Sequence, residues 1–487
     1  MNSPIKHPLR FFAVAAIGTF IGTLEGSILN VALPTIAGDL GAEVDEVAWV
    51  VLAYSVTLVS LMTVFGAWAA RRGYGFAYRF GYLFFLVGTT TCALSGDLHV
   101  LIAGRVVQAV GAAMFQAIGM GLLTSVFPAN QRGKAIGLMA MVVAVGLTSG
   151  PPLGGLILST WPWHAIFVVT IPVGIIGLLL STAVFRGFVS PISHKPLNIG
   201  TAAALSVALL SAMLWLSFFE DFPFLDLRML GLAVVGVIAA ILFIRLELNP
   251  ERSLIGLELF MNRQFSISVA AMFLMFASMA GALILIPFYL QDIRGLEPKT
   301  IGLYLIVLPL TMAMFAPLSG RISDRIGYRF LTSLGLAMFA LGMYLLLQLE
   351  PSTGSWHLIV SLIVIGSGVG IFNSPNSSAM MGSVTAKQRP ISSGILSTTR
   401  VLGMASGIAV STAVFSYYKH RFAGLGGEDV VFVEAMHRVI WISIVMTVTG
   451  MLICSFRKNR LHDFWEDFDP GGSGPGTKTV DSPADNN

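Results

Sequence analysis

The sequence predicts an all-α membrane protein built from two six-helix halves plus two inserted helices, with fourteen transmembrane helices in total. Three observations predict this class. The chain is 55% hydrophobic and 11% charged, it contains fourteen apolar runs of bilayer-spanning length, and its two halves repeat short motifs. Its mean hydropathy of +0.81 excludes an ordinary water-soluble globular protein.

The apolar runs define the order of the expected helices. They lie at about residues 11–34, 48–69, 76–95, 99–127, 134–157, 164–185, 199–219, 227–246, 265–291, 300–320, 330–349, 357–381, 391–417 and 438–456. The two cysteines, Cys92 and Cys454, both fall within these runs, so no disulfide framework is expected.

The basic residues indicate how these helices cross the membrane. A cytoplasmic N-terminus places 21 of the 29 Lys and Arg residues in cytoplasmic segments and six outside, with Arg105 and Arg400 inside spans. The positive-inside rule therefore predicts a multi-pass protein of the cytoplasmic (inner) membrane with both termini in the cytoplasm. No basic patch interleaved with aromatic residues is present, so a nucleic-acid partner is not expected.

Two motif pairs indicate an internal duplication. Residues 66–80 resemble residues 320–330 with an offset of 254, and residues 111–116 resemble residues 368–373 with an offset of 257. Such repeats build transporters, which hold the substrate near mid-membrane between two halves that rock against each other. We expect an N-terminal half at 1–190, an inserted helix pair at 191–250, a C-terminal half at 251–460 and a disordered cytoplasmic tail at 461–487.

The fifth apolar run is unusually rich in residues that disfavour ordinary helices. It contains Gly146, Gly150, Pro151, Gly154 and Gly155 within ten positions. Glycine allows a neighbouring helix to approach closely, and proline removes a backbone donor and bends the span. The pattern G-x-x-x-G-P-x-x-G-G resembles the antiporter signature of the major facilitator superfamily. The alternative interpretation is a general packing seam of small residues.

Further stretches resemble one branch of that superfamily, the fourteen-helix drug:proton antiporters (EmrB/QacA-like). Residues 24–34, LEGSILNVALP, are similar to L-D-x-T-I-V-N-V-A-L-P, with Glu25 in place of Asp and Ser27 in place of Thr. Residues 163–174, WHAIFVVTIPVG, are similar to W-R-W-I-F-L-I-N-V-P-I-G, with departures that include Thr170. Arg105, Gln108 and Gly111 match the branch's R-x-x-Q-x-x-G pattern.

The resemblance implies a proton-coupled secondary antiporter that exports amphipathic or cationic drugs and toxic compounds. Its expected partners are a small amphipathic substrate, protons and membrane lipid, with the proton gradient in place of a cofactor and no metal. In a Gram-negative host, the resemblance also implies a periplasmic adaptor protein and an outer-membrane channel. The alternative is export of one endogenous metabolite, such as a lipid precursor, a siderophore or an amino acid derivative.

Glu25 and Arg105 are the expected proton-coupling residues. A carboxylate inside an apolar span is energetically costly, and such groups usually face water and often relay protons. Arg105 keeps its charge and would act as a fixed positive group beside the carboxylate. The alternative interpretation is a structural pair between Glu25 and Arg105. Polar residues in other spans are candidates for the substrate cavity or for cross-helix packing: Asn30, Gln108, Gln116, Asn373, Asn376 and Arg400.

A loop pattern between spans predicts a conformational latch, that is, a contact that holds one state closed. The pattern G-x-x-x-D-R-x-G is intact at Gly320, Asp324, Arg325 and Gly327. Its Asp is expected to accept hydrogen bonds from the N-terminus of a neighbouring helix. In the first half, Ala70 occupies the acidic position, which puts the latch there in doubt.

Motifs of enzymes and of ATP-driven pumps are absent from the sequence. It contains no G-x-x-x-x-G-K-[ST], no H-E-x-x-H and no G-x-S-x-G. The chain is therefore predicted to be a transporter and not an enzyme.

Overall fold

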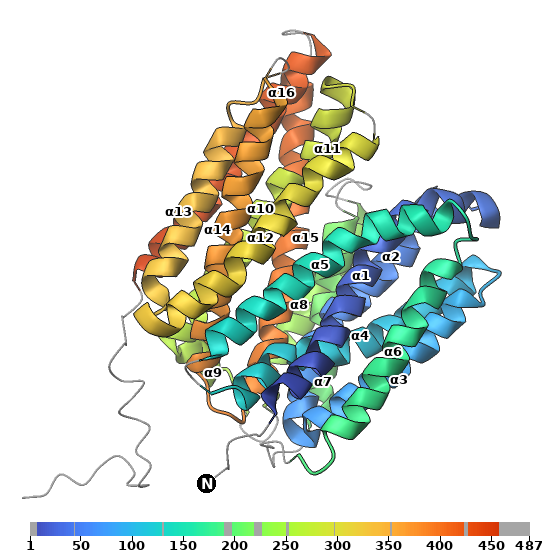
Figure 1. Ribbon diagram of the computed structural model, residues 1–487, viewed down its shortest axis with the longest axis vertical. Helices are drawn as coiled ribbons and strands as arrows, with labels where there is room; N and C mark the ends of the chain where they lie inside the picture. Colours follow the sequence, from blue (N-terminus) through green and yellow to red (C-terminus); the bar gives the residue numbers. More distant parts are fainter. Residues whose placement is uncertain are drawn as a thin grey trace, which may run out of the picture.

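The computed structural model describes residues 7–42, 44–128, 131–188, 197–218, 226–249, 253–296, 298–350, 353–422 and 427–456. Over these residues the protein consists of helices and their connections, without strands (Figure 1). The predicted tail at 461–487 and the predicted domain boundaries near 190, 250 and 460 lie outside the described residues.

The helices follow the expected order with a few additions. They are α1 (Pro8–Leu40), α2 (Val44–Arg72), α3 (Tyr74–Ala93), α4 (Leu98–Val126), α5 (Arg132–Leu158), α6 (Ala165–Val184), α7 (Ile199–Ser217), α8 (Leu227–Glu247), α9 (Glu258–Met261), α10 (Arg263–Leu283), α11 (Ile286–Phe288), the π-helix η2 (Tyr289–Ile293), α12 (Pro298–Ile326), α13 (Tyr328–Leu346), α14 (Ser355–Gly382), α15 (Arg389–Phe422) and α16 (Glu428–Ser455).

Among the described residues, thirteen helices are long and apolar enough to cross a membrane. The remaining expected span corresponds to α3, whose Arg79 and three tyrosines lower its hydropathy. The fold class predicted from the sequence is confirmed.

The structure confirms the span expected at 265–291 and corrects the start of the last one. The first corresponds to the candidate membrane span Arg263–Gln291, in which the regular helix α10 ends at Leu283 and α11 and η2 follow around Pro287, which lacks a backbone N–H. The last helix begins at Glu428 instead of residue 438, because a charged first segment is also helical. In that segment, Glu434 and Arg438 are 3.9 Å apart and one turn apart on the helix.

The two six-helix halves repeat the same packing. Helices α3 and α4 pack together in the first half as α13 and α14 do in the second, and α2 with α4 corresponds to α12 with α14. The glycines of the sequence repeat explain the first pair. A Cβ at Gly111 would collide with the backbone nitrogen of Phe85, and a Cβ at Gly368 would collide with that of Phe339. In both halves, glycine therefore allows two backbones to come into contact.

The inserted pair α7 and α8 packs beside the seam between the halves. Helix α7 contacts α2 of the first half and α15 of the second. Val56 and Val59 of α2 form an apolar cluster there with Met213 of α7 and Val401 of α15. Most of α8 is exposed, as expected for a helix that faces lipid.

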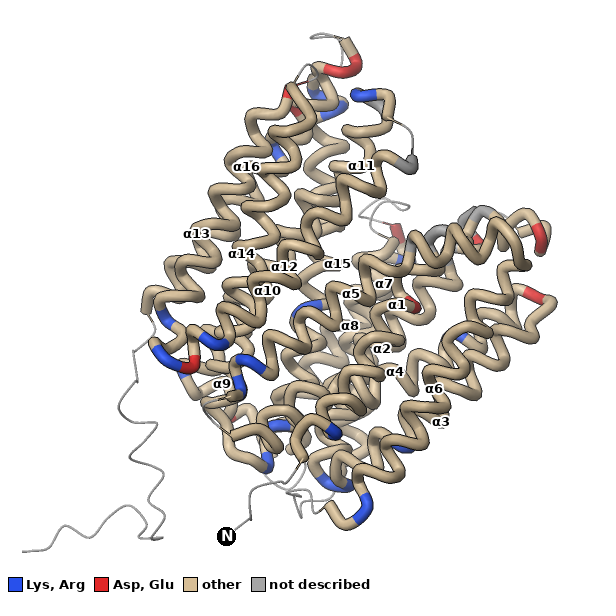
Figure 2. Tube along the Cα trace, viewed as in Figure 1, with Lys and Arg blue, Asp and Glu red and all other residues tan. Residues whose placement is uncertain are grey.

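Lys and Arg residues gather at one end of the helix bundle, where α1 also begins (Figure 2). We call this the basic end; it carries the α2–α3, α4–α5 and α12–α13 connections. The halves meet there through two related contacts, α5 with α12 and α2 with α15. Seen in Figure 1, α5 and α12 approach each other at the basic end and diverge towards the opposite end.

Candidate functional site

Glu25 lies in the interior of the first half, where α1, α4 and α6 meet. Its side chain is 0% exposed. Arg105 of α4 places Nη1 3.0 Å from Glu25 Oε2, and Thr170 of α6 donates its hydroxyl to Glu25 Oε1 at 2.8 Å. Both carboxylate oxygens therefore have a partner, and the buried pair is electrically neutral.

The Arg105 guanidinium makes further contacts with α4 and α2. Nη1 also donates to Gln108 Oε1 at 2.6 Å, and Nε donates to the Val50 carbonyl at 3.2 Å. The guanidinium carbon is 4.2 Å from the centre of the Tyr54 ring, a cation–π distance. Gln108 in turn donates to Thr89 Oγ1 at 2.7 Å. Residues of four helices, α1, α2, α3 and α4, thus fix the position of Arg105. In this conformation Arg105 and Glu25 form an ion pair.

Thr170 was not among the residues predicted for this site. The sequence signal for it lies in the departures from the family pattern. Glu25 replaces the pattern's Asp, and Thr170 replaces the pattern's Asn. These two residues are in direct contact. Glu25 is longer than the Asp of the pattern, and its partner Thr170 is shorter than the Asn of the pattern.

The glycine-rich part of α5 packs against α1 near Glu25. A Cβ at Gly146 would overlap the Thr23 hydroxyl, and a Cβ at Gly150 would lie 2.7 Å from the backbone nitrogen of Ile28. Ser27 also donates to the Gly146 carbonyl at 3.3 Å. The α1–α5 contact is therefore a backbone-to-backbone approach that any side chain would disturb.

The remaining members of the antiporter signature differ in their surroundings. Gly154 is buried, whereas Gly155 is exposed and a Cβ there would meet nothing within 4 Å. Pro151 lies within α5, but its side chain lies outside the described part of the chain. The close approach to α1 thus concentrates at Gly146 and Gly150.

Asp324, near the end of α12, reaches the first turn of α5 across the interface between the halves. Its carboxylate accepts from the backbone N–H of Gly133 at 2.9 Å and of Lys134 at 3.3 Å. Unpaired N–H groups at a helix start favour a negative charge. Gly320 allows this approach, because a Cβ there would collide with the Gly133 carbonyl.

The other two residues of the loop pattern lie after Asp324. Arg325 is exposed. Gly327 has a positive φ of 83° where the chain turns into α13, a conformation that favours glycine.

The corresponding corner of the first half is built differently. Gly66 packs against the Pro390 carbonyl of α15, as Gly320 packs against that of Gly133, and Ala70 is fully buried. Proline has no N–H to offer a carboxylate. Arg389 instead donates to the Thr124 carbonyl of α4 at 2.8 Å.

The candidate cavity residues fall into two groups. Asn376 donates to the Ser268 carbonyl at 3.0 Å, so it joins α14 to α10. Gln116 Nε2, Asn373 Oδ1 and Arg400 Nε are buried and have no hydrogen-bond partner among the described residues. Asn30 lies in α1, but its side chain lies outside the described residues.

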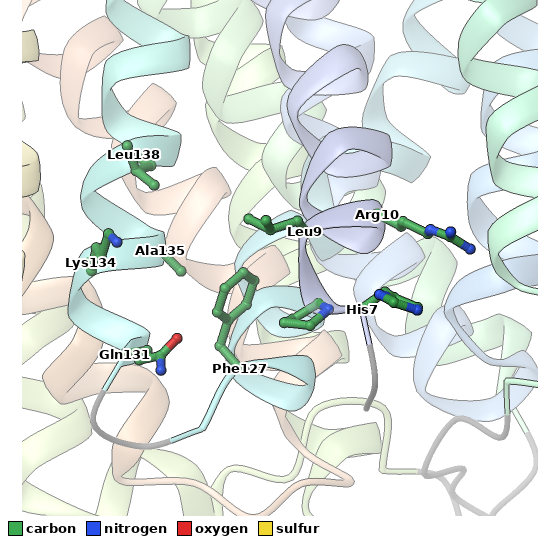
Figure 3. Close-up of a pocket in the computed structure, with 9 residues that line it drawn as sticks. His7, Leu9, Arg10, Phe127, Gln131, Lys134, Ala135 and Leu138 are labelled. Carbon is green, nitrogen blue, oxygen red and sulfur yellow. The ribbon is translucent and has the colours of Figure 1, made fainter. Parts of the chain in front are cut away.

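A cavity of about 470 Å³ opens at the basic end, apart from these residues. It is lined from the start of α1, the α4–α5 connection and the start of α5, with Leu9, Phe127 and Ala135 among its residues (Figure 3). None of the predicted site residues lines it.

Comparison with known proteins identifies the family. The model of the Major Facilitator Superfamily matches residues 15–284 and 268–463. The riboflavin transporter RibZ of Clostridioides difficile (strain 630) is 32% identical over 447 residues, which cover 91% of this chain and 96% of RibZ. The multidrug resistance protein Stp of Mycobacterium tuberculosis (strain CDC 1551 / Oshkosh) is 30% identical over 411 residues, covering 82% of this chain and 74% of Stp.

A solved structure agrees at the level of the fold. The proton:xylose symporter XylE, bound to a glucose analogue, superposes with a TM-score of 0.64 at 13% identity, covering 92% of this chain and 94% of XylE. The family match spans both halves, and RibZ is similar along nearly its whole length. The chain is a multi-pass membrane transporter, not an enzyme, and it belongs to the major facilitator superfamily.

Proposed function

We propose that this transporter is a proton-coupled antiporter that exports small amphipathic compounds, with Glu25 as the proton carrier. The observation that carries the proposal is the position of this carboxylate. Glu25 is the only acidic residue inside the fourteen spans predicted from the sequence, and its side chain is completely buried beside a fixed cation. An intramembrane carboxylate of this kind is by default a functional group.

The geometry supports a cycle in which the Glu25–Arg105 pair opens and closes. Arg105 cannot release its proton, so it stabilises Glu25 in the ionised form while they are 3.0 Å apart. Protonation of Glu25 removes that attraction, and Arg105 keeps its contacts with Gln108, Val50 and Tyr54. Proton uptake would therefore free α1 and α6 to move while α4 and α2 keep the arginine in place.

The second requirement of antiport is a switch between two openings. In this conformation the two halves are in contact at the basic end, which would be the closed side. Asp324 contacts the start of α5, and Arg389 contacts the end of α4. We place the protein in the cytoplasmic (inner) membrane with both termini in the cytoplasm, as the charge distribution predicts. In a Gram-negative host, a periplasmic adaptor and an outer-membrane channel would receive the substrate.

A second candidate is the transport of one endogenous metabolite. The similarity to RibZ, which is named a riboflavin transporter, favours it, whereas the similarity to Stp, named a multidrug resistance protein, favours a broader range. The two candidates differ in how many unrelated compounds the protein moves.

Proteoliposomes that contain the purified protein test both candidates. Transport of riboflavin, ethidium and 1-naphthaleneacetate is measured with and without an imposed pH gradient. We expect the gradient to accelerate transport in the wild type and not in Glu25→Gln, whose amide cannot carry a proton. Glu434→Gln is the matched control, because Glu434 is half exposed. Undiminished gradient-driven transport by Glu25→Gln would contradict the role of Glu25, and transport of riboflavin alone would favour the second candidate.

A further inference from the structure

Arg400 is a cation without a compensating charge among the described residues. It lies in α15, and its side chain is partly buried. Among the described residues, its Nε has no hydrogen-bond partner and its guanidinium forms no ion pair. Its guanidinium carbon lies 5.5 Å from the centre of the Phe276 ring of α10. A cation–π contact offsets only part of the cost of removing a guanidinium from water.

The charges within the spans do not balance. Away from the ends of the predicted spans, the charged residues are two arginines, Arg105 and Arg400, and one acidic residue, Glu25. Glu25 has both oxygens occupied by Arg105 and Thr170. The middle of the spans therefore holds one net positive charge, at Arg400 in the second half.

One donor of the first half, the Gln116 side chain, belongs to a residue that lies beside the same stretch of α15. Ser397, one turn before Arg400, donates to the Gln116 carbonyl of α4 at 3.4 Å, which brings α15 beside α4. Gln116 Nε2 has no partner in the part of the chain that the structure describes, and it lies against α1, because a Cβ at Gly22 would meet it. One turn further along the same face of α1, Gly26 is exposed and faces open space.

Apolar side chains complete this surface. Phe276 lies under the guanidinium, and Met404, one turn after Arg400 on the same face of α15, is partly buried. Phenylalanine and methionine accommodate aromatic and irregular apolar groups. This part of the protein thus combines a cation (Arg400), an amide donor (Gln116) and apolar side chains (Phe276 and Met404).

We propose that Arg400, assisted by Gln116, binds the anionic group of the transported compound, so that the substrate is an amphipathic anion. A carboxylate, phosphate or sulfonate fits the fork of guanidinium donors and supplies the missing negative charge. The apolar part of the substrate then packs on Phe276 and Met404. This inference deepens the proposed export function, and it argues against the cationic compounds expected from the sequence, because Arg400 repels them.

Equilibrium binding to the purified protein in detergent tests the inference. Three probes share one ring system and differ in charge: 1-naphthaleneacetate, 1-naphthaleneacetamide and 1-naphthylmethylammonium. We expect the wild type to bind them in that order. Arg400→Gln should weaken binding of the carboxylate at least about tenfold and leave the amide within about twofold, the pattern of a lost charge-assisted contact. Arg400→Lys should recover part of the preference, and Gln116→Leu should reduce it less than Arg400→Gln.

Arg263→Gln is the matched control, because Arg263 is an exposed arginine on α10 and its loss changes the net charge equally. Size-exclusion elution and thermal unfolding verify that each variant is folded. Equal affinity of the wild type for the three probes, an absence of binding, or an anion preference that survives in Arg400→Gln would overturn the proposal. No proton gradient enters this measurement, so its outcome is independent of whether Glu25 couples transport to protons.

Discussion

The contact between Thr170 and Glu25 predicts that two departures from the family pattern compensate each other. Replacing Glu25 with Asp shortens the side chain by one carbon–carbon bond, about 1.5 Å. The 2.8 Å hydrogen bond from Thr170 would then stretch beyond hydrogen-bonding distance. Because the acceptor is charged and fully buried, we expect a loss of about 1.5–3 kcal/mol in the free energy of unfolding.

The reverse single change should also destabilise the protein, for a different reason. Thr170→Asn introduces a longer side chain against Glu25 in a closely packed site, which costs about 1–3 kcal/mol. In the double variant, which has the residue types of the family pattern at both positions, we expect the longer amide to reach the shorter carboxylate. We therefore expect the two changes to be non-additive, with a favourable coupling energy of at least about 1 kcal/mol.

The assay is a double-mutant cycle on the detergent-solubilised protein, with denaturant unfolding and vesicle transport measured for each variant. Thr182→Asn is the matched control, because Thr182 is an exposed threonine on the same helix. Paired with Glu25→Asp, it should give additive effects. Additive losses for Thr170→Asn with Glu25→Asp would refute the reasoning that these residues compensate each other.

Other changes test the contacts between helices. Gly150→Ala should slow transport in vesicles, because its Cβ would overlap α1, whereas Gly155→Ala should not, because nothing lies within 4 Å; equal rates would argue against a close-packed α1–α5 contact. Asp324→Asn weakens a contact of about 1.5–3 kcal/mol and should increase labelling of cysteines introduced at the basic end, so unchanged labelling would argue against a latch. Ala70→Asp should leave labelling unchanged, because Pro390 offers no N–H; a shift would reveal another donor.

Much of the fold could be predicted because apolar length and charge placement are recorded directly in the sequence. The runs around α4, α6 and α14 are apolar over the whole width of a bilayer, and their positions match the structure closely. The exceptions have local causes. Within the span expected at 265–291, the regular helix ends at Leu283 and its geometry changes around Pro287, and the charged start of α16 extends a helix beyond its apolar run.

The candidate site was harder to predict because it depends on which faces of distant helices meet. The sequence indicates that Glu25 and Arg105 attract each other, but 80 residues separate them, and only packing decides whether they touch. Thr170 is a common residue on a strongly apolar helix, and no spacing rule places it beside a carboxylate. The available signal was that Thr170, like Glu25, departs from the family pattern. That signal points to this site only once the structure shows that the two side chains are in contact.

The two corners that hold the halves together at the basic end show how a broken motif is replaced. In one corner the negative Asp324 lies at the start of α5, where unpaired N–H groups give a helix its positive pole. In the other corner the positive Arg389 contacts the Thr124 carbonyl near the end of α4, which is the negative pole of that helix. The first half therefore has Ala70 in place of an acidic residue, and its corner has a positive charge at the C-terminal end of a helix instead of a negative charge at an N-terminal end. Both corners close through a charge at a helix end, although only one of them retains the sequence pattern.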